Sequence, residues 1–413
     1  MFTPSQVKPV ATKPADTPAR PERVSVDTDS KRYVLPELVP GSATARALYS
    51  VWSGEPIVTV ASPPGGGKST LIVELVAHLV TRAAMTVRIG CPTNAQVRSL
   101  SDRLSAELPD EYRSRVRVMT LAAAGSKWAQ RKGPTQVSDG GDLFIVDEAY
   151  QASFADVIAA TGDDYKQILL VGDPGQIGPV VTTNVGPYVD SKSPPHVRAL
   201  DVFRARADAV NHNIDGTYRF GPATVAAIAP LYDFPFGTHR PARHLVGRDG
   251  TVWPELASMA VVCDSVTDTA IGAAIRERVQ QLLHTRPVDA DDDSGAPASM
   301  LGQHDIAVVV ARNTQRVLVQ GLLAAEYLDG VTVGTSDSLQ GGQWRAVIAL
   351  DPLAGAESLT DHTTNLGRLC VMASRHTTHL TWVHAPNWRD LLTGDEATSA
   401  AMSVREALTG AIA

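Results

Sequence analysis

The sequence predicts an α/β fold in which two parallel β-sheet domains follow one another, and two observations lead to this prediction. Short apolar, β-branched runs alternate with helical patterns, and a segment rich in Pro, Ser, Asn and Gly interrupts the alternation at 182–195. Strands that alternate with helices favour parallel pairing through right-handed crossovers. The interruption therefore separates two expected domains, at 37–195 and 196–395.

The expected strands and helices are read from runs of apolar residues and from helical periodicity. In the first domain the strand-like runs cover 57–60, 86–89, 116–119, 143–146 and 168–171, with helical patterns at 69–82 and 95–107. In the second domain the strand-like runs cover 259–262, 306–310, 331–333, 346–350 and 379–383.

Bulk composition limits the class of protein. The chain has 413 residues, of which 44% are hydrophobic, and a formal net charge of −7. This length suits two or three domains, and the negative charge excludes a uniformly basic nucleic-acid coat but not a local basic groove. Cys91, Cys263 and Cys370 form no Cys-x-x-Cys pair, which argues against a zinc module and favours a reducing compartment.

No apolar run in the sequence is long enough to cross a membrane, so we expect a cytoplasmic protein without a membrane partner. The predominance of arginine over lysine favours a bacterial or phage source. Residues 1–36 lack periodicity and predict a disordered tail that can dock a protein partner, while 396–413 are expected to form a C-terminal helix or tail. The acidic stretch that begins at Asp289 is interpreted as a solvated loop rather than a metal site.

The most specific motif is a glycine-rich turn between the first expected strand and the first expected helix. Residues 62–69 read Ser-Pro-Pro-Gly-Gly-Gly-Lys-Ser, with Ser62 where the motif usually has Gly. Such a turn cradles a triphosphate because its backbone N–H groups and the helix N-terminus face the phosphate oxygens. Lys68 is expected to reach the β- and γ-phosphates, and Ser69 to ligate Mg²⁺; a chance glycine-rich turn is the alternative. The residues expected to bind nucleotide here are Pro64, Gly65, Gly66, Gly67, Lys68, Ser69 and Thr70.

Polar residues follow two of the later strands in the first domain. Asp147 is expected to hold Mg²⁺ and Glu148 to activate the attacking water. Acidic strand ends are common, and only the position after a phosphate loop favours the functional interpretation. Gln176 is expected beside the γ-phosphate, although Gly-Asp-Pro-Gly at 172–175 would also form an ordinary turn.

In their order along the chain, these motifs resemble those of superfamily 1 helicases. The similarity is greatest to the branch that contains the nonsense-mediated-decay RNA helicase and its DNA-helicase relatives. It spans about residues 55–385 and implies two tandem RecA-like domains that hydrolyse ATP with Mg²⁺ in order to move 5′-to-3′ on single-stranded DNA or RNA. The matching segments are Pro63–Lys68, Pro92–Val97, Asp147–Ala152, Gly172–Pro179, Tyr218–Pro222, Val309–Gln315, Thr335–Gly341 and Arg368–Arg375.

The resemblance also implies roles for individual residues. Arg219 and Arg375 would neutralise charge at the γ-phosphate, unless they are surface residues or structural ion-pair partners. Tyr218 would stack on adenine, and Gln343, where the family often has Glu, would face the ribose. The residues expected to contact a single strand are Pro92, Thr93, Asn94, Thr120, Thr335 and Ser338, with turn or helix-cap duty as the alternative for Thr93, Asn94 and Thr335.

Departures from the family pattern leave two functions open. The Gln that reads adenine in the family has no equivalent before Ile57, and the spacing of the motifs leaves little room for accessory domains. The chain is expected to be either a helicase or translocase, or a nucleic-acid-dependent ATPase clamp or remodelling subunit that does not unwind. An unrelated P-loop kinase would explain the phosphate loop but not the motifs after residue 200.

Overall fold

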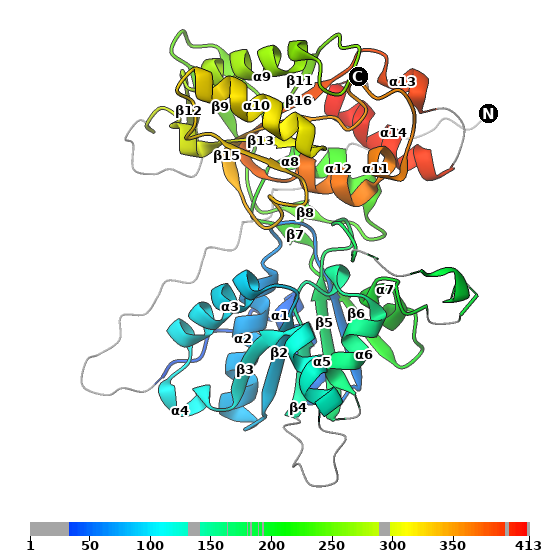
Figure 1. Ribbon diagram of the computed structural model, residues 1–413. Coiled ribbons are helices and arrows are strands. Elements are labelled where there is room, and N and C mark those ends of the chain that lie inside the picture. The colour runs from blue at the N-terminus through cyan, green and yellow to red at the C-terminus, as the bar shows by residue number, and fades with distance from the viewer. Residues whose placement is uncertain are drawn as a thin grey trace, which may run out of the picture. The chain divides into compact units, whose positions relative to one another are not determined.

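The computed structural model contains two parallel β-sheets, each with helices on both faces (Figure 1). The chain divides into two units, Met1–Leu35 and Pro36–Ala413, and every element below belongs to the second. Most of the predicted tail and the acidic stretch from Asp289 lie outside the described residues. The structure describes residues 33–130, 141–162, 164–179, 181, 184–188, 190–191, 194–288, 298–392 and 396–410.

The first sheet has the strand order β3-β2-β4-β5-β1-β6, and all of its strands are parallel. The five strands predicted for the first domain are confirmed as β1 to β5. The strand bounds are β1 Ile57–Ala61, β2 Val87–Cys91, β3 Val116–Thr120, β4 Gly141–Val146, β5 Tyr165–Gly172 and β6 Ala209–Asn213.

Strand β6 extends the first sheet past residue 195, which is the predicted end of the first domain. It pairs with β1 from Ile57–Ala209 to Ala61–Asn213. Its sequence, Ala-Val-Asn-His-Asn, has too few apolar residues to be recognised as a strand from an apolar run. Side-chain hydrogen bonds help to attach it to β1, and in one of them Thr59 Oγ1 donates to Asn211 Oδ1 at 2.6 Å. The first sheet therefore ends at β6 rather than at the predicted boundary, and the other domain limits stay predictions.

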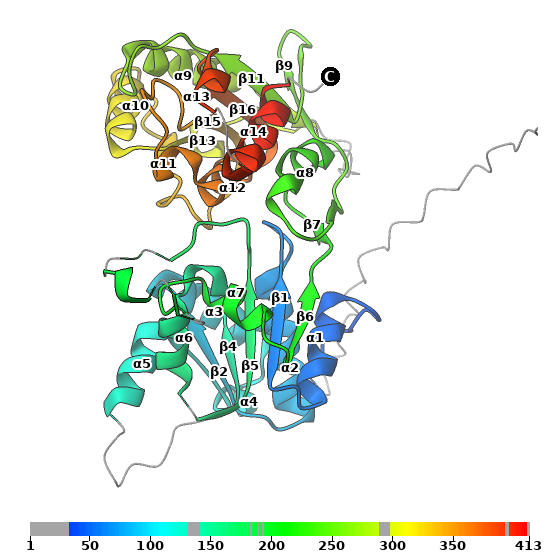
Figure 2. The same ribbon diagram turned by 90° about the vertical axis from the view of Figure 1, so that its right-hand side faces the viewer.

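Two layers of helices cover the first sheet. When every crossover is right-handed, the helices of crossovers that run toward β3 lie on one face of the sheet, and the helices of crossovers that run toward β6 lie on the other face. One layer holds α1 (Ala43–Trp52), α2 (Lys68–Arg82) and α3 (Asn94–Glu107), and α4 (Asp110–Arg113) follows it. The other layer holds α5 (Leu121–Gln130), α6 (Phe154–Thr161) and α7 (Ala199–Arg204), and Figure 2 shows α1 and α5 on opposite sides of the strands.

The second sheet has the order β11-β16-β15-β13-β14 and is also parallel. All five strands predicted for the second domain are present, but the run at 259–262 is displaced. Strand β11 starts at Leu256, because pairing with β16 from Leu256–Leu380 onward sets its limits rather than local hydrophobicity. The bounds are β11 Leu256–Ala260, β13 Ile306–Val310, β14 Thr332–Thr335, β15 Trp344–Leu350 and β16 His376–His384.

Strand β13 shows how the second sheet forms a core on each face. Ile306, Val308 and Val310 pack with α9 (Thr269–Leu282) and α10 (Asn313–Ala325). Ala307 and Val309, which point the other way, pack with α8 (Pro222–Ile228), α12 (Leu366–Ala373) and α14 (Glu396–Thr409). Both sets are apolar because a parallel strand is covered on both faces.

The C-terminal helix α14 is held to the second sheet by a buried ion pair. Arg405 Nε lies 2.9 Å from Asp351 Oδ2, and both side chains are fully buried. Removal of one partner from such a pair leaves a buried charge without compensation, which costs about 3–5 kcal/mol. The helix is therefore part of the core rather than an appendage.

Short strands and helices complete the described part of the fold. A two-stranded sheet and a three-stranded sheet lie outside the two main sheets. Their strands are β7 (Gly216–Thr217) with β8 (Gly237–Thr238), and β10 (Val252–Trp253), β9 (His244–Gly247) and β12 (Thr285–Val288). The short helices are α11 (Asp361–Thr364), α13 (Trp388–Leu391), η1 (Ala149–Gln151), η2 (Gly186–Tyr188), η3 (Ala229–Leu231) and η4 (Gln303–Asp305).

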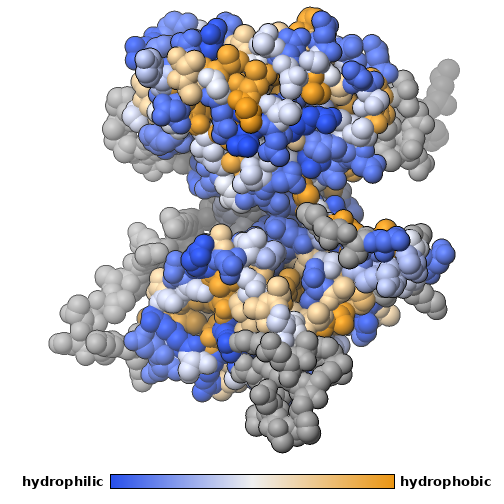
Figure 3. Space-filling view, in the orientation of Figure 1, coloured by the Kyte–Doolittle hydropathy of each residue, from blue (hydrophilic) through white to orange (hydrophobic). Residues whose placement is uncertain are grey.

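Hydrophilic residues cover most of the face shown in Figure 3, and hydrophobic residues appear there in small groups. Among the helices that the structure describes, none is both long and apolar enough to span a lipid bilayer.

Candidate nucleotide-binding site

Two pockets adjoin at Arg219, which lines both. The larger, of about 580 Å³, contains the glycine-rich turn and is called the phosphate-loop pocket. The smaller, of about 440 Å³, is called the Tyr218 pocket. The predicted site residues that line the phosphate-loop pocket are Gly65, Gly66, Gly67, Lys68, Ser69, Thr70, Thr93, Asp147, Glu148, Gln176, Arg219, Ser338 and Arg375.

The glycine-rich turn requires glycine for two separate reasons. Gly65 has φ +73°, and a Cβ atom there would lie 2.5 Å from Cβ of Arg219. Gly67 has φ +91° and is the N-cap of α2, so an L side chain at this position would be strained. The turn is also braced from outside, because Thr217 Oγ1 donates to the carbonyl of Pro64 at 2.7 Å. Its backbone shape is thus fixed by residues about 150 positions later in the chain.

Lys68 is the first residue of α2 and projects toward two carboxylates. Its side chain is 10% exposed, and Nζ lies 3.6 Å from Glu148 Oε1. Glu148 has φ +51°, a left-handed conformation that is rare outside glycine. Strain of this kind clusters at functional sites, where the surrounding structure holds it in place.

Asp147 directly follows β4, at the strand end that the sequence predicts, and its side chain is buried. Its Oδ1 accepts the backbone N–H of Glu148 at 3.0 Å. Burial, and then the charge of Glu148, raises the pKa of Asp147 to about 7, while Lys68 opposes this rise. A carboxylate whose ionised form is so poorly solvated is well suited to a cation as a partner.

The loop after β5 brings a second buried carboxylate and two amides together. Asp173 accepts from Gln176 Nε2 at 2.9 Å and from the hydroxyl of Tyr232 at 2.9 Å. Gln340, which follows β14, donates to Gln176 Oε1 at 2.9 Å. Burial raises the pKa of Asp173, although Lys68 and the Tyr232 hydroxyl oppose this rise.

Two arginines line the phosphate-loop pocket together with Lys68. Arg219 Nη1 donates to the carbonyl of Ser374 at 3.0 Å, and Arg375 Nε donates to Val371 at 3.1 Å. One buried nitrogen of each guanidinium, Nε of Arg219 and Nη1 of Arg375, has no hydrogen-bond partner among the described residues. Burial, and then repulsion by Arg375, lowers the pKa of Arg219 to about 9, and burial also lowers the pKa of Arg375.

The donor set of the pocket fits Mg²⁺ only when a phosphate supplies further ligands. In the part of the chain that the structure describes, no group of three or more His, Cys, Asp and Glu side chains is placed to hold a metal. Ser69 and Asp147 line the same pocket and offer a hydroxyl and a carboxylate. Mg²⁺ is commonly held by one or two carboxylates, waters and substrate phosphates, so this sparse set is sufficient.

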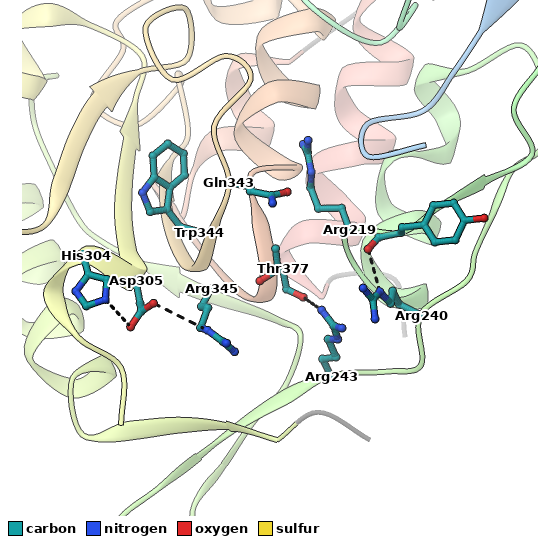
Figure 4. Close-up of a pocket in the computed structure, with 10 residues that line it drawn as sticks. Arg219, Arg240, Arg243, His304, Asp305, Gln343, Trp344, Arg345 and Thr377 are labelled. Atoms are coloured by element: carbon teal, nitrogen blue, oxygen red, sulfur yellow. Dashed lines mark hydrogen bonds and ion pairs between the residues drawn. The ribbon is translucent and has the colours of Figure 1, made fainter. Parts of the chain in front are cut away.

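The Tyr218 pocket contains the two residues predicted to contact the nucleoside. Tyr218 is 56% exposed, and one face of its ring stacks on His239 with a centroid distance of 4.4 Å. Gln343 lines the same pocket, just before β15. Figure 4 shows Arg243 and Arg345 on one side of this pocket, with Gln343 and Arg219 on the other.

Several of the residues predicted to contact single-stranded nucleic acid form local hydrogen bonds. Thr93 is the N-cap of α3, where Oγ1 donates to Gln96 Oε1 at 2.8 Å and accepts the N–H of Gln96. Thr335 Oγ1 accepts the N–H of Ser338 at 3.3 Å, and Ser338 Oγ donates to the Thr335 carbonyl at 3.0 Å. The cap and turn duties considered as alternatives for Thr93 and Thr335 are thus present.

The other predicted contacts with a single strand lie outside the lining of both pockets. Thr120 caps α5 by accepting the N–H of Ala123 at 3.1 Å. Pro92, Asn94 and Thr335 also line neither pocket. Their contact with nucleic acid stays a prediction.

Gln340 and Arg103 are among the residues that line the phosphate-loop pocket without having been predicted as site residues. Gln340 lies inside the segment Thr335–Gly341, so its motif was a usable signal. Arg103, in α3, donates to Thr70 Oγ1 at 2.9 Å and lines the pocket. Nothing local distinguishes Arg103 from a solvated helical arginine, because its partner lies on α2.

Comparison with known proteins supports a nucleotide-binding fold for the first sheet. Residues 43–223 match a family model described as an AAA domain, and this range runs from α1 into α8. A search of the curated proteins gave no match.

Among solved structures, the chain is similar to the PRRSV helicase and to the complex of Arterivirus nonstructural protein 10 (helicase) with DNA. The first is 16% identical with a TM-score of 0.45, over 84% of this chain and 54% of that chain. The second is 15% identical with a TM-score of 0.41, over 83% of this chain and 63% of that chain. The chain thus spans less than two thirds of the length of either helicase.

Proposed function

We propose that this chain is an ATP-dependent helicase or translocase that moves on single-stranded nucleic acid, with 5′-to-3′ polarity. The observation that carries the proposal is the pair of arginines in the wall of the phosphate-loop pocket. Arg219 and Arg375 each leave a buried nitrogen without a hydrogen-bond partner among the described residues, in the pocket that Lys68 also lines. Three cationic side chains, Lys68, Arg219 and Arg375, thus line one pocket, and this concentration of positive charge favours an anionic ligand.

A nucleoside triphosphate supplies an anion of the required form. The glycine-rich turn and Lys68 hold the β- and γ-phosphates. The two arginines, which come after the last strand of the first sheet in the sequence, face the γ-phosphate. Positive groups that are fixed in advance stabilise the charge that develops as phosphate is transferred, and one arginine of this kind is worth roughly 10³–10⁵ in rate. The Arg219 guanidinium stays protonated at neutral pH, because its lowered pKa is still about 9.

Glu148 is the proposed base for the attacking water, and Gln176 orients that water or senses the γ-phosphate. Both side chains line the phosphate-loop pocket. Ser69 and Asp147 are the residues that would hold Mg²⁺, which neutralises phosphate charge when it is bound. Lys68 attracts Glu148 at 3.6 Å, and we expect a bound phosphate to compete for Lys68 and release the carboxylate.

The Tyr218 pocket is the proposed site for the nucleoside. His239 already covers one face of the Tyr218 ring, so a base would stack on the other face. Gln343 would face the ribose. Because Arg219 lines both pockets, a single nucleotide can extend from Tyr218 to Lys68.

Coupling to nucleic acid is proposed through the segments that contribute to the phosphate-loop pocket from each sheet. Thr93 follows β2, and Ser338 follows β14. Contacts of this kind reach the phosphate backbone and read no sequence, so the proposal covers both DNA and RNA. Because the hydroxyl hydrogen of Thr93 is donated to Gln96, a phosphate contact requires the Gln96 bond to be exchanged.

Strand displacement tests the proposal. Purified protein is given ATP and partial duplexes with either a 5′ or a 3′ single-stranded overhang, in DNA and in RNA. The proposal predicts unwinding from the 5′ overhang. Stimulated hydrolysis without displacement from either overhang would identify an ATPase clamp or remodelling subunit instead, and activity independent of nucleic acid would reject both.

A further inference from the structure

The two arginines of the phosphate-loop pocket are attached to one buried hydrogen-bond network. We infer that His376, together with Thr224 and Glu255, forms a positioning device that holds Arg219 and Arg375 at fixed positions relative to one another. The inference rests on the proposed function, because it assigns these buried residues a role in the hydrolysis of the same nucleotide.

The segment that carries Arg219 is anchored by Glu255. This carboxylate accepts the backbone N–H groups of Ala223 at 3.2 Å and of Thr224 at 3.1 Å, and it also accepts the Thr224 hydroxyl. Glu255 is only 5% exposed, and its position next to β11 ties residues 222–224 to the second sheet. The main chain just after Arg219 therefore has a fixed place.

The segment that carries Arg375 is anchored by the next residue. His376 is fully buried at the start of β16, and its Nε2 lies 2.8 Å from Thr224 Oγ1 and 3.9 Å from Glu255 Oε1. Its ring also stacks on Phe220, with a centroid distance of 5.9 Å and an interplanar angle of 29°. His376 thus contacts Phe220, which precedes α8, and Thr224, which lies within it. The residue before His376, Arg375, lines the phosphate-loop pocket.

The directions of the hydrogen bonds follow from the chemistry of the three groups. The single hydroxyl hydrogen of Thr224 is given to Glu255, so Thr224 must accept the next bond from His376 Nε2–H. His376 Nδ1 is buried and has no partner in the described part of the chain, which suits a neutral ring with its hydrogen on Nε2. Burial lowers the pKa of His376, in agreement with a neutral ring at physiological pH.

A direct bond between the two arginine segments completes the device. Arg219 Nη1 donates to the carbonyl of Ser374 at 3.0 Å, immediately before Arg375. Residues 374–376 therefore touch the Arg219 segment at the guanidinium, at Phe220 and at Thr224. Displacement of catalytic groups by about 1 Å can cost on the order of 100-fold in rate, so the position of the two arginines relative to one another matters for turnover.

Substitutions at Thr224 separate positioning from general packing. Thr224→Val keeps the shape but removes the hydroxyl that joins His376 to Glu255, whereas Thr224→Ser keeps the hydroxyl. We expect Thr224→Val to lower kcat for ATP at least about tenfold with KM changed less than about twofold, and Thr224→Ser to stay within about threefold of wild type. His376→Ala should behave like Thr224→Val, and His376→Gln, whose amide can donate to Thr224, should recover part of kcat.

His379→Ala is the matched control for loss of a buried histidine in the same strand. His379 bonds to the Pro254 carbonyl at 2.6 Å and to Thr381 at 2.8 Å, and it contacts neither arginine segment in these bonds. We expect it to lower the melting temperature without the selective loss of kcat. Affinity for ADP–aluminium fluoride, which mimics the transferred phosphate, should fall about tenfold in Thr224→Val while affinity for ADP alone is retained.

The outcomes distinguish this inference from the proposed function. Wild-type kcat and ADP–aluminium fluoride affinity in folded Thr224→Val and His376→Ala would overturn the positioning role alone. Equal losses of kcat in Thr224→Ser and Thr224→Val would do the same, because only packing would then explain them. A wild-type protein that neither hydrolyses ATP nor binds ADP–aluminium fluoride would overturn both.

Discussion

The side-chain amide of Gln340 donates a hydrogen bond to the amide oxygen of Gln176 across 2.9 Å. Gln176 follows β5 of the first sheet, and Gln340 follows β14 of the second, so the bond joins strand ends from both sheets in the wall of one pocket. Gln176 also donates to buried Asp173 at 2.9 Å. A phosphate that contacts Gln176 would therefore act on Gln340 as well.

Loss of the Gln340 amide should weaken this link between the sheets. We expect Gln340→Ala to reduce nucleic-acid-stimulated kcat about three- to tenfold, because a neutral hydrogen bond contributes about 1 kcal/mol. Steady-state hydrolysis with saturating single strands measures the effect. Gln320→Ala removes an exposed amide from α10 and serves as the control, and an equal loss in both variants would reject a specific role for Gln340.

Asp147→Asn should stabilise the nucleotide-free protein in a pH-dependent way. The pKa of Asp147 is raised by burial to about 7 from 3.8, so the folded state binds the extra proton between these values and stability falls as pH rises through them. Near pH 4 the carboxyl is neutral, and Asn should have little effect. At pH 8 the variant should be more stable by on the order of 2–4 kcal/mol, measured by denaturant unfolding.

Asp142→Asn gives the control of opposite sign for that experiment. The backbone N–H of Thr86, and then the Lys166 side chain, lower the pKa of Asp142. Its stabilisation is therefore present above its normal pKa and is lost as pH falls, so Asp142→Asn should destabilise the protein at pH 8. A stability difference for Asp147→Asn that does not vary between pH 4 and pH 8 would show that Asp147 is not held protonated.

Two fully buried arginines should respond differently to substitution by Met. Arg375 has a nitrogen without a partner among the described residues, whereas Arg405 is paired with Asp351 at 2.9 Å. Arg375→Met should lower kcat by roughly 10³-fold or more with little loss of stability. Arg405→Met should cost about 3–5 kcal/mol of unfolding free energy, while the folded fraction keeps its kcat.

Arg375→Lys tests whether charge alone is sufficient at this position. Lysine is a point charge that lacks the planar fork of arginine, so we expect Lys to restore less than about a tenth of the lost kcat. Thermal unfolding establishes that each variant is folded. Full activity in Arg375→Met would remove this arginine from the site.

Tyr218→Ala should raise KM for ATP more than it lowers kcat. A base that stacks on an aromatic ring gains about 1–3 kcal/mol, which corresponds to a rise in KM of about five- to 150-fold. Tyr218→Phe keeps the ring and should stay close to wild type. Unchanged KM in Tyr218→Ala would place the nucleoside outside the Tyr218 pocket.

The elements that the sequence predicts well are those whose signals are local. Strands β1 to β5 and the turn at Gly65–Gly67 are recognisable because apolar runs and glycines act within a few residues. Strand β6 was missed because its polar residues are held by contacts with β1, such as Thr59 with Asn211.

The same reason explains the gaps in the predicted site. Arg103 and His376 acquire their roles from partners on other elements, and no periodicity or spacing reveals such a partner. Gln340 differs from them, because it lies inside a segment that matched a family motif. Lys68, Asp147 and Arg375, which the order of the motifs assigned to one site, line one pocket, although 307 positions separate residue 68 from residue 375.

ATP hydrolysis by wild type and by Lys68→Ala, each with and without single-stranded DNA or RNA, tests the central claim most directly. Lys68 lines the phosphate-loop pocket and is mostly buried, so its loss should abolish turnover while circular dichroism shows an intact fold. The account predicts that at least one nucleic acid accelerates wild-type hydrolysis about tenfold or more, and that Lys68→Ala shows no hydrolysis in any condition. Wild-type hydrolysis that neither DNA nor RNA accelerates, or turnover that survives in Lys68→Ala, would contradict it.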